Sequence, residues 1–251
     1  LVKDDRLRES DDGYKLQSPE QKDWEQARQA IGDLTPGPSM RLRRQLLKQA
    51  LTGLSVARGR TFKVEVTVDG ETIVAGDLPL HIDEADTARR DELRTASRET
   101  ANENRITWVY ELSPDTWHAL DELHRSRMMI ERRDTPNKTT AEVELLGEER
   151  EREARHERTA LQRLARDLAA GQVIFRGRVD DVNGGDLRST AQTLVADRVD
   201  EIYPQLHQFT ANLRRDDVLH LLRTTDLGTV HESLRDGGIN LVRVSPTGYE
   251  I

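Results

Sequence analysis

A cluster of basic residues is the clearest candidate for chemistry in this sequence. It falls in the first half of a predicted helix and comprises Arg41, Arg43, Arg44 and Lys48. Guanidinium and ammonium groups neutralise the phosphates of nucleic acids, so the cluster indicates a contact with double-stranded DNA. The alternative is a solvated helix face whose cations pair with acidic neighbours, and the residues alone leave both interpretations open.

No motif in the sequence predicts an active site. It contains no G-x-x-x-x-G-K-[ST] phosphate loop, no G-x-G-x-x-G and no H-E-x-x-H. Cysteine is absent, which excludes a disulfide scaffold, a structural cysteine–zinc site and a thiol nucleophile. The adjacent carboxylates at 180–181 and 216–217 do not converge simply by being neighbours, as catalytic pairs must. We therefore expect no catalytic residue, no cofactor site and no metal site in this chain.

Aromatic and histidine residues give weaker candidates. Trp108, Tyr110 and Trp117 would stack on bases only if they were exposed, and their apolar surroundings favour packing in the core. His118 and His124 are six residues apart on a predicted helix, so their side chains point in different directions. That spacing is unfavourable for a zinc site.

Composition and charge exclude several classes of protein. The formal net charge of −8 argues against a wholly basic protein that wraps DNA, although local basic patches remain possible. No apolar run approaches the roughly 18 residues of a membrane span. The chain begins Leu-Val-Lys-Asp-Asp, without an apolar signal region and without an initiator methionine. We expect a cytoplasmic protein and a fragment of a longer polypeptide.

Strand and helix signals alternate in the first half of the chain. Ser18-Pro19 predicts a helix start, and a leucine stripe predicts a second helix from Met40 to about Leu54. After Thr61 apolar and polar residues alternate, and Asp69-Gly70 predicts a hairpin turn. The predicted elements are then strands at 61–68 and 71–75, a helix at 86–101, a strand at 105–112 and a helix at 113–130. This alternation is typical of a small α/β domain.

A long charged helix is predicted from Thr139 to Ala170. Few apolar residues occur between Glu148 and Arg158, where opposite charges three and four residues apart support a helix by about 0.2–0.5 kcal/mol per pair. We expect this stretch either to cross solvent or to pair weakly with another helix, as a coiled-coil or spacer arm.

Both ends of the chain contain hairpin signals. Asp12-Gly13 predicts a turn between two short strands, and residues 240–251 predict two strands after helices at 214–224 and 229–236. A helix followed by such a hairpin is typical of a winged helix. The expected fold is therefore α+β and helix-rich, with winged-helix-like hairpin ends. Its four expected units are a winged-helix remnant with a helical segment at 1–60, an α/β domain at 61–133, a helical arm at 134–171 and a helical, winged-helix-like domain at 172–251.

One stretch of sequence resembles a known family. Residues 139–205 combine the charged helix with Ala170-Gly171-Gln172-Val173-Ile174-Phe175-Arg176-Gly177 and then a helix that ends in Tyr203-Pro204. This order is similar to the central region of the large BrxC/PglY-type P-loop proteins of BREX bacteriophage-defence systems. Residues 12–18 and the strand at 105–112 resemble elements upstream in those proteins. The residues after 206 depart from the commoner BrxC pattern and favour the actinobacterial PglY side.

The resemblance implies a function that residue patterns do not. It implies a large cytoplasmic AAA-like ATPase that uses ATP and Mg²⁺ and works with a DNA methyltransferase and other defence proteins. The family's nucleotide-binding residues have no counterpart here, so this chain would be a non-catalytic middle fragment. Its partners would be the rest of its own polypeptide, other defence proteins and double-stranded DNA, with no membrane. The alternatives are a stand-alone winged-helix DNA-binding regulator and a small hydrolase with an unrecognised carboxylate site at 180–181.

Overall fold

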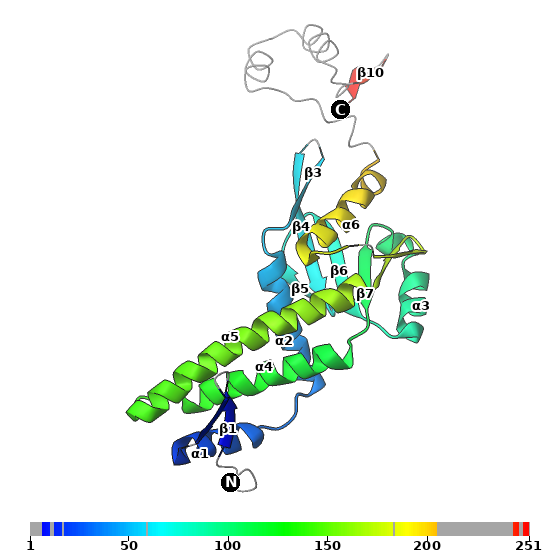
Figure 1. The fold of residues 1–251 in the computed structure, drawn as a ribbon. Helices are drawn as coiled ribbons and strands as arrows, with labels where there is room; N and C mark the ends of the chain where they lie inside the picture. The colour runs from blue at the N-terminus through cyan, green and yellow to red at the C-terminus, as the bar shows by residue number, and fades with distance from the viewer. Residues whose placement is uncertain are drawn as a thin grey trace, which may run out of the picture.

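A mixed β-sheet forms the centre of the fold (Figure 1). In this computed structural model the described residues are 7–10, 13–16, 18–58, 60–182, 184–204, 243–245 and 248–250, and within them this sheet has seven strands. The strands are β3 (Ser55–Arg58), β4 (Arg60–Val68), β5 (Glu71–Val74), β6 (Leu78–Glu84), β7 (Ile106–Tyr110), β8 (Gln172–Phe175) and β9 (Arg178–Asp181). Their order is β3-β4-β6-β7-β8-β9, and β5 pairs with β4. Strands β4, β6 and β7 are parallel, and the other pairs are antiparallel.

Side chains of the predicted types cap most of the helices. The α-helices in the described part of the chain are α1 (Pro19–Gln29), α2 (Pro36–Leu51), α3 (Thr87–Ala96), α4 (Pro114–Arg133), α5 (Thr140–Ala169) and α6 (Leu187–Ile202). The hydroxyl of Ser18 accepts a hydrogen bond from the backbone N–H of Gln21, and Thr139 does the same for Glu142. Such caps satisfy N–H groups that have no partner inside the helix. The mixed α/β character expected from the sequence is confirmed.

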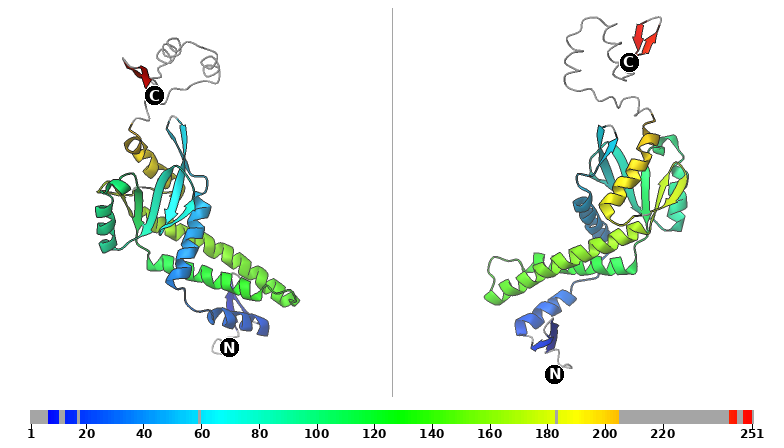
Figure 2. Two further views of the ribbon diagram at one scale, coloured as in Figure 1. Left: turned by 180° about the vertical axis from the view of Figure 1, so that it is seen from behind. Right: turned by 45° about the horizontal axis from the view of Figure 1, so that its top comes forward.

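The two faces of the sheet are covered differently. One face is apolar and packs into the main core, with Val64 and Val66 of β4 and Leu80 of β6 fully buried beneath helices α2, α4, α5 and α6. The other face carries α3 over β7 and β8, where Leu93 packs against Val109 and Ile174. Figure 2 shows α3 beside the sheet, away from the long helices. Because side chains alternate along a strand, one face of β4 and β6 is apolar and the other polar.

Helices α4 and α5 lie side by side and extend away from the sheet (Figure 1). Arg163 pairs with Asp115 at one end, and Arg150 pairs with Asp134 at the other, so the two helices are antiparallel. Helix α1 packs on their far part, where Trp24 is buried. The charged stretch of α5 thus pairs with other helices rather than crossing solvent.

The sheet and the main core run through the expected unit boundaries at 133–134 and 171–172. Strand β8 pairs with β7, and the main core includes residues from Leu34 to Ile202. The sequence does not predict that β7 and β8 pair, because helices α4 and α5 separate the two strands along the chain.

Hairpins occur at both ends, as predicted. Strand β1 (Leu7–Ser10) pairs with β2 (Gly13–Leu16), and β10 (Arg243–Ser245) pairs with β11 (Gly248–Glu250). The helices predicted at 214–224 and 229–236, and the carboxylates at 216–217, lie outside the described residues. The winged-helix assignment of the ends therefore stays a prediction.

Candidate nucleic-acid interface

Helix α2 carries the predicted basic cluster. The helix begins at Pro36, whose fixed backbone angle suits a first helical position, and its leucines are buried in the main core. Arg41, Arg44 and Lys48 follow the spacing i, i+3 and i+7, which places them on one side of a helix. The structure brings these three residues to the same groove.

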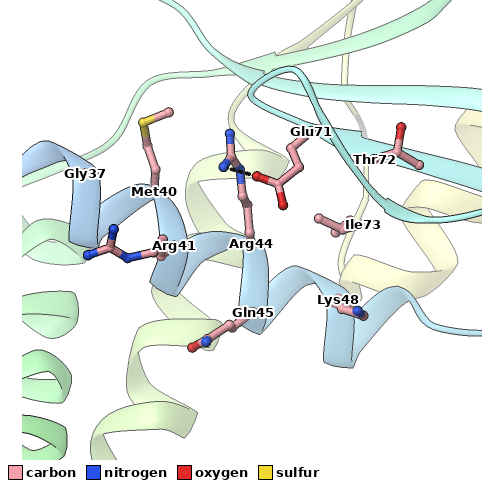
Figure 3. A pocket seen from close by; sticks show the side chains of 9 residues that line it. All are labelled: Gly37, Met40, Arg41, Arg44, Gln45, Lys48, Glu71, Thr72 and Ile73. Atoms are coloured by element: carbon pink, nitrogen blue, oxygen red, sulfur yellow. Dashed lines mark hydrogen bonds and ion pairs between the residues drawn. The ribbon is translucent and has the colours of Figure 1, made fainter.

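The groove lies between α2 and strand β5 (Figure 3). Its volume is about 550 Å³. Glu71, Thr72 and Ile73 of β5 form the wall opposite the basic side of the helix. Glu71 contributes a negative charge to this groove, and no motif in the sequence marks it as a groove residue. The predicted Asp69-Gly70 turn is the sequence signal from which the position of Glu71 near the end of β4 could have been inferred.

Arg44 is fixed to the sheet. Its Nε donates a hydrogen bond to the carbonyl oxygen of Val68 at 3.1 Å, and its Nη2 donates to the carbonyl oxygen of Asp69 at 2.8 Å. Its Nη1 pairs with the carboxylate of Glu71 (Figure 3). Arg44 thus joins α2 to the β4–β5 turn, and little of its charge is left for a partner.

Arg41 and Lys48 are exposed. Neither side chain makes a hydrogen bond or an ion pair with any residue in the described part of the chain. Seven residues of helix rise about 10.5 Å, so these two residues lie about two turns apart along α2. This pair can contact phosphates without first breaking an internal interaction.

Arg43 has a different role from its neighbours. Its side chain is 4% exposed and lies beneath the ends of β4, β6 and β7. Its Nη1 donates to the hydroxyl of Tyr110 at 2.6 Å and pairs with Glu84 at 2.7 Å, while its Nη2 is 3.5 Å from Asp69. Burial lowers the pKa of Arg43, but attraction to Tyr110, Asp69 and Glu84 outweighs this and raises it. The structure therefore separates Arg43 from the groove.

The remaining candidates do not converge on a site. Trp108 is buried and donates its indole N–H to the carbonyl oxygen of Leu168 at 2.9 Å, so the predicted core packing of Trp108 and Tyr110 is confirmed. Asp180 pairs with Arg198, and Asp181 accepts a hydrogen bond from Gln172. These two adjacent carboxylates thus bind different partners. No group of three or more potential metal ligands occurs among the described residues.

Replacing Arg44 with methionine is expected to lower the free energy of unfolding by about 1.5–3 kcal/mol, the usual loss for hydrogen bonds that involve a charged group. Replacing exposed Arg41 with methionine is expected to change it by no more than about 0.5 kcal/mol. Urea unfolding of both variants measures the difference. Equal losses of stability in the Arg44 and Arg41 variants would contradict the structural role assigned to Arg44.

A comparison of the chain with protein-family models, with curated proteins and with solved structures gave no match. Among the described residues, no helix combines the length and the apolar character needed to cross a membrane.

Proposed function

We propose that this chain is a non-catalytic module that contacts duplex DNA through the groove between α2 and β5. The observation that carries the proposal is the pair Arg41 and Lys48, two exposed cations on a helix that Arg44 fixes to the sheet. Neither cation has a side-chain partner among the residues that the structure describes. Two phosphate contacts give weak binding on their own. Low affinity for DNA is sufficient for one part of a larger protein whose other parts also contact DNA.

The larger machine that we propose is a cytoplasmic P-loop ATPase of the BREX type. Support comes from the resemblance of the segment 170–177, whose key residues have structural roles in this fold. A side chain at Gly171 would have its Cβ only 2.2 Å from the carbonyl oxygen of Val109, and Gly177 has φ of +75°. Phe175 is buried at 1% exposure. Such residues favour a shared fold in this part of the sheet and carry over no catalytic role.

The proposed partners follow from the proposal that this chain is part of a larger ATPase. They are the rest of the same polypeptide, which would hold the nucleotide site, and other defence proteins such as a DNA methyltransferase. ATP and Mg²⁺ belong to that remaining part, because this sequence has no phosphate loop.

A titration of fluorescently labelled duplex DNA tests the proposal. With two phosphate contacts, affinity is expected to fall about twelvefold between about 50 and 200 mM salt, because the salt slope is about −0.9 per contact. ATP is expected to have no effect. Absence of binding at both salt concentrations would overturn DNA contact by this chain, and binding that requires ATP would contradict its non-catalytic assignment.

A further inference from the structure

A second pocket lies on the opposite side of the sheet from the α2 groove. Its volume is about 440 Å³. The polar face of β4 and β6 contributes Thr67, His81 and Asp83, and helix α3 contributes Arg89 and Leu93. Thr67 is directly opposite His81 in the register of the parallel strands, and Asp83 is two residues further along β6. The ends of neighbouring parallel strands are a common place for small-molecule sites.

Three polar side chains line this pocket, and the charge of one of them, Arg105, acts on the other two. Among the residues that the structure describes, His81, Asp83 and Arg105 make no side-chain hydrogen bond and no ion pair. His81 and Asp83 are half-buried, Arg105 is exposed, and the polar side-chain atoms of all three still reach solvent. Three polar groups of different charge around one cavity are groups that a polar ligand can contact in place of water.

The charges of the pocket restrict the ligand. Burial raises the pKa of Asp83, and Asp69 raises it further, against the opposing effect of Arg89 and Arg105. Burial lowers the pKa of His81 to about 4, helped by the charge of Arg105, so the imidazole is neutral near pH 7. Of the other charged residues that line the pocket, Asp69 and Glu84 face Arg43 and Arg89 pairs with Glu92. The groups that remain for a ligand are the carboxyl group of Asp83, the cation of Arg105 and the neutral imidazole of His81.

None of the described residues that line the pocket is Phe, Tyr or Trp, so it offers no large ring on which a nucleobase would stack. We propose that it binds a small zwitterion, a free α-amino acid whose carboxylate lies against Arg105 and whose ammonium group lies against Asp83. A ligand with both signs of charge pairs with both Arg105 and Asp83, whereas a simple anion would satisfy only Arg105 and would face Asp83.

The role of Asp83 can be separated from folding. Because its pKa is raised in the fold, the ionised carboxylate makes the protein less stable as pH rises through that pKa. Asp83→Asn is therefore expected to be at least as stable as the wild type at pH 7. A residue that lowers stability in this way is typical of a binding site.

The experiment measures the thermal unfolding midpoint with each common free L-amino acid in turn, followed by calorimetric titration of the best one. We expect at least one to raise the midpoint. Asp83→Asn and Arg105→Gln are each expected to weaken its affinity about tenfold or more, as loss of a charged hydrogen bond would. Arg132→Gln, which changes an exposed arginine near the end of α4, is the control and should bind as the wild type does.

Blocked ligands check the orientation. The affinity of the wild type for the N-acetyl derivative should equal the affinity of Asp83→Asn for the free amino acid. The affinity for the N-acetyl derivative should be the same in Asp83→Asn as in the wild type. Failure of every free amino acid to raise the midpoint would overturn the proposal. So would unchanged affinity in Asp83→Asn and Arg105→Gln, or equally tight binding of acetate or inorganic phosphate. None of these outcomes depends on DNA binding at the α2 groove.

Discussion

Replacing Glu149 with alanine is expected to lower the free energy of unfolding by about 3–5 kcal/mol, the usual loss when one partner of a buried ion pair is removed. Glu149 is 1% exposed in α5 and accepts hydrogen bonds from Trp24 at 3.1 Å, Arg28 at 3.4 Å and Arg152 at 3.0 Å. The variant leaves two guanidinium groups and an indole N–H with fewer partners. Urea unfolding monitored by circular dichroism measures the loss.

Glu144→Ala is the matched control. Glu144 is on the same helix but exposed, so its removal should change stability by no more than about 0.5 kcal/mol. A loss of similar size in both variants would show that helix propensity or net charge, rather than the buried network, accounts for the effect.

Replacing Arg43 with alanine is also expected to cost about 3–5 kcal/mol of stability, because Asp69, Glu84 and Tyr110 lose their shared cation. Arg43→Lys should recover only part of the loss, since an ammonium group cannot reproduce the planar donor geometry of a guanidinium group. Urea unfolding gives both values.

Measuring DNA affinity distinguishes a structural role of Arg43 from a role in DNA contact. Measured where circular dichroism shows the variant to be folded, Arg43→Ala should bind duplex DNA within about twofold of the wild type. The two carboxylates already balance the charge of Arg43, so it adds little to the field outside. A variant of unchanged stability with strongly reduced DNA affinity would contradict the assignment.

The local elements could be predicted because their signals are local. Ser18-Pro19 and Thr139 begin helices through capping, and the alternation from Phe62 to Val68 gives β4 its two faces. Asp69-Gly70 forms the predicted turn, with φ of +46° and +78°. These features depend on a few neighbouring residues, so the sequence is sufficient for them.

The functional surfaces were harder to predict because they join distant segments. Arg43 and Arg44 are adjacent in sequence, yet one is buried and the other lies at the groove. Helical periodicity does indicate that Arg43 is buried. Arg43 is three and four residues before the buried Leu46 and Leu47, so it lies on the same side of the helix as they do. The partners Asp69, Glu84 and Tyr110 could not be identified without the packing of α2 on the sheet.

The pocket beside α3 was missed for a related reason. In β6 the buried Leu78, Leu80 and Ile82 alternate with Pro79, His81 and Asp83, which lie on the other face of the sheet. Whether that face is covered depends on where α3 packs, and α3 covers β7 and β8 instead. Arg105 comes from the start of the next strand and meets His81 only through the parallel pairing of β6 and β7.

The salt dependence of DNA binding in an Arg41→Gln/Lys48→Gln double variant tests the central claim most directly. The wild type should show a slope of log affinity against log salt of about −1.8, from two phosphate contacts. The double variant should show weaker binding and a slope close to zero, while its unfolding curve stays that of the wild type. An unchanged slope in a folded double variant would contradict DNA contact through this groove.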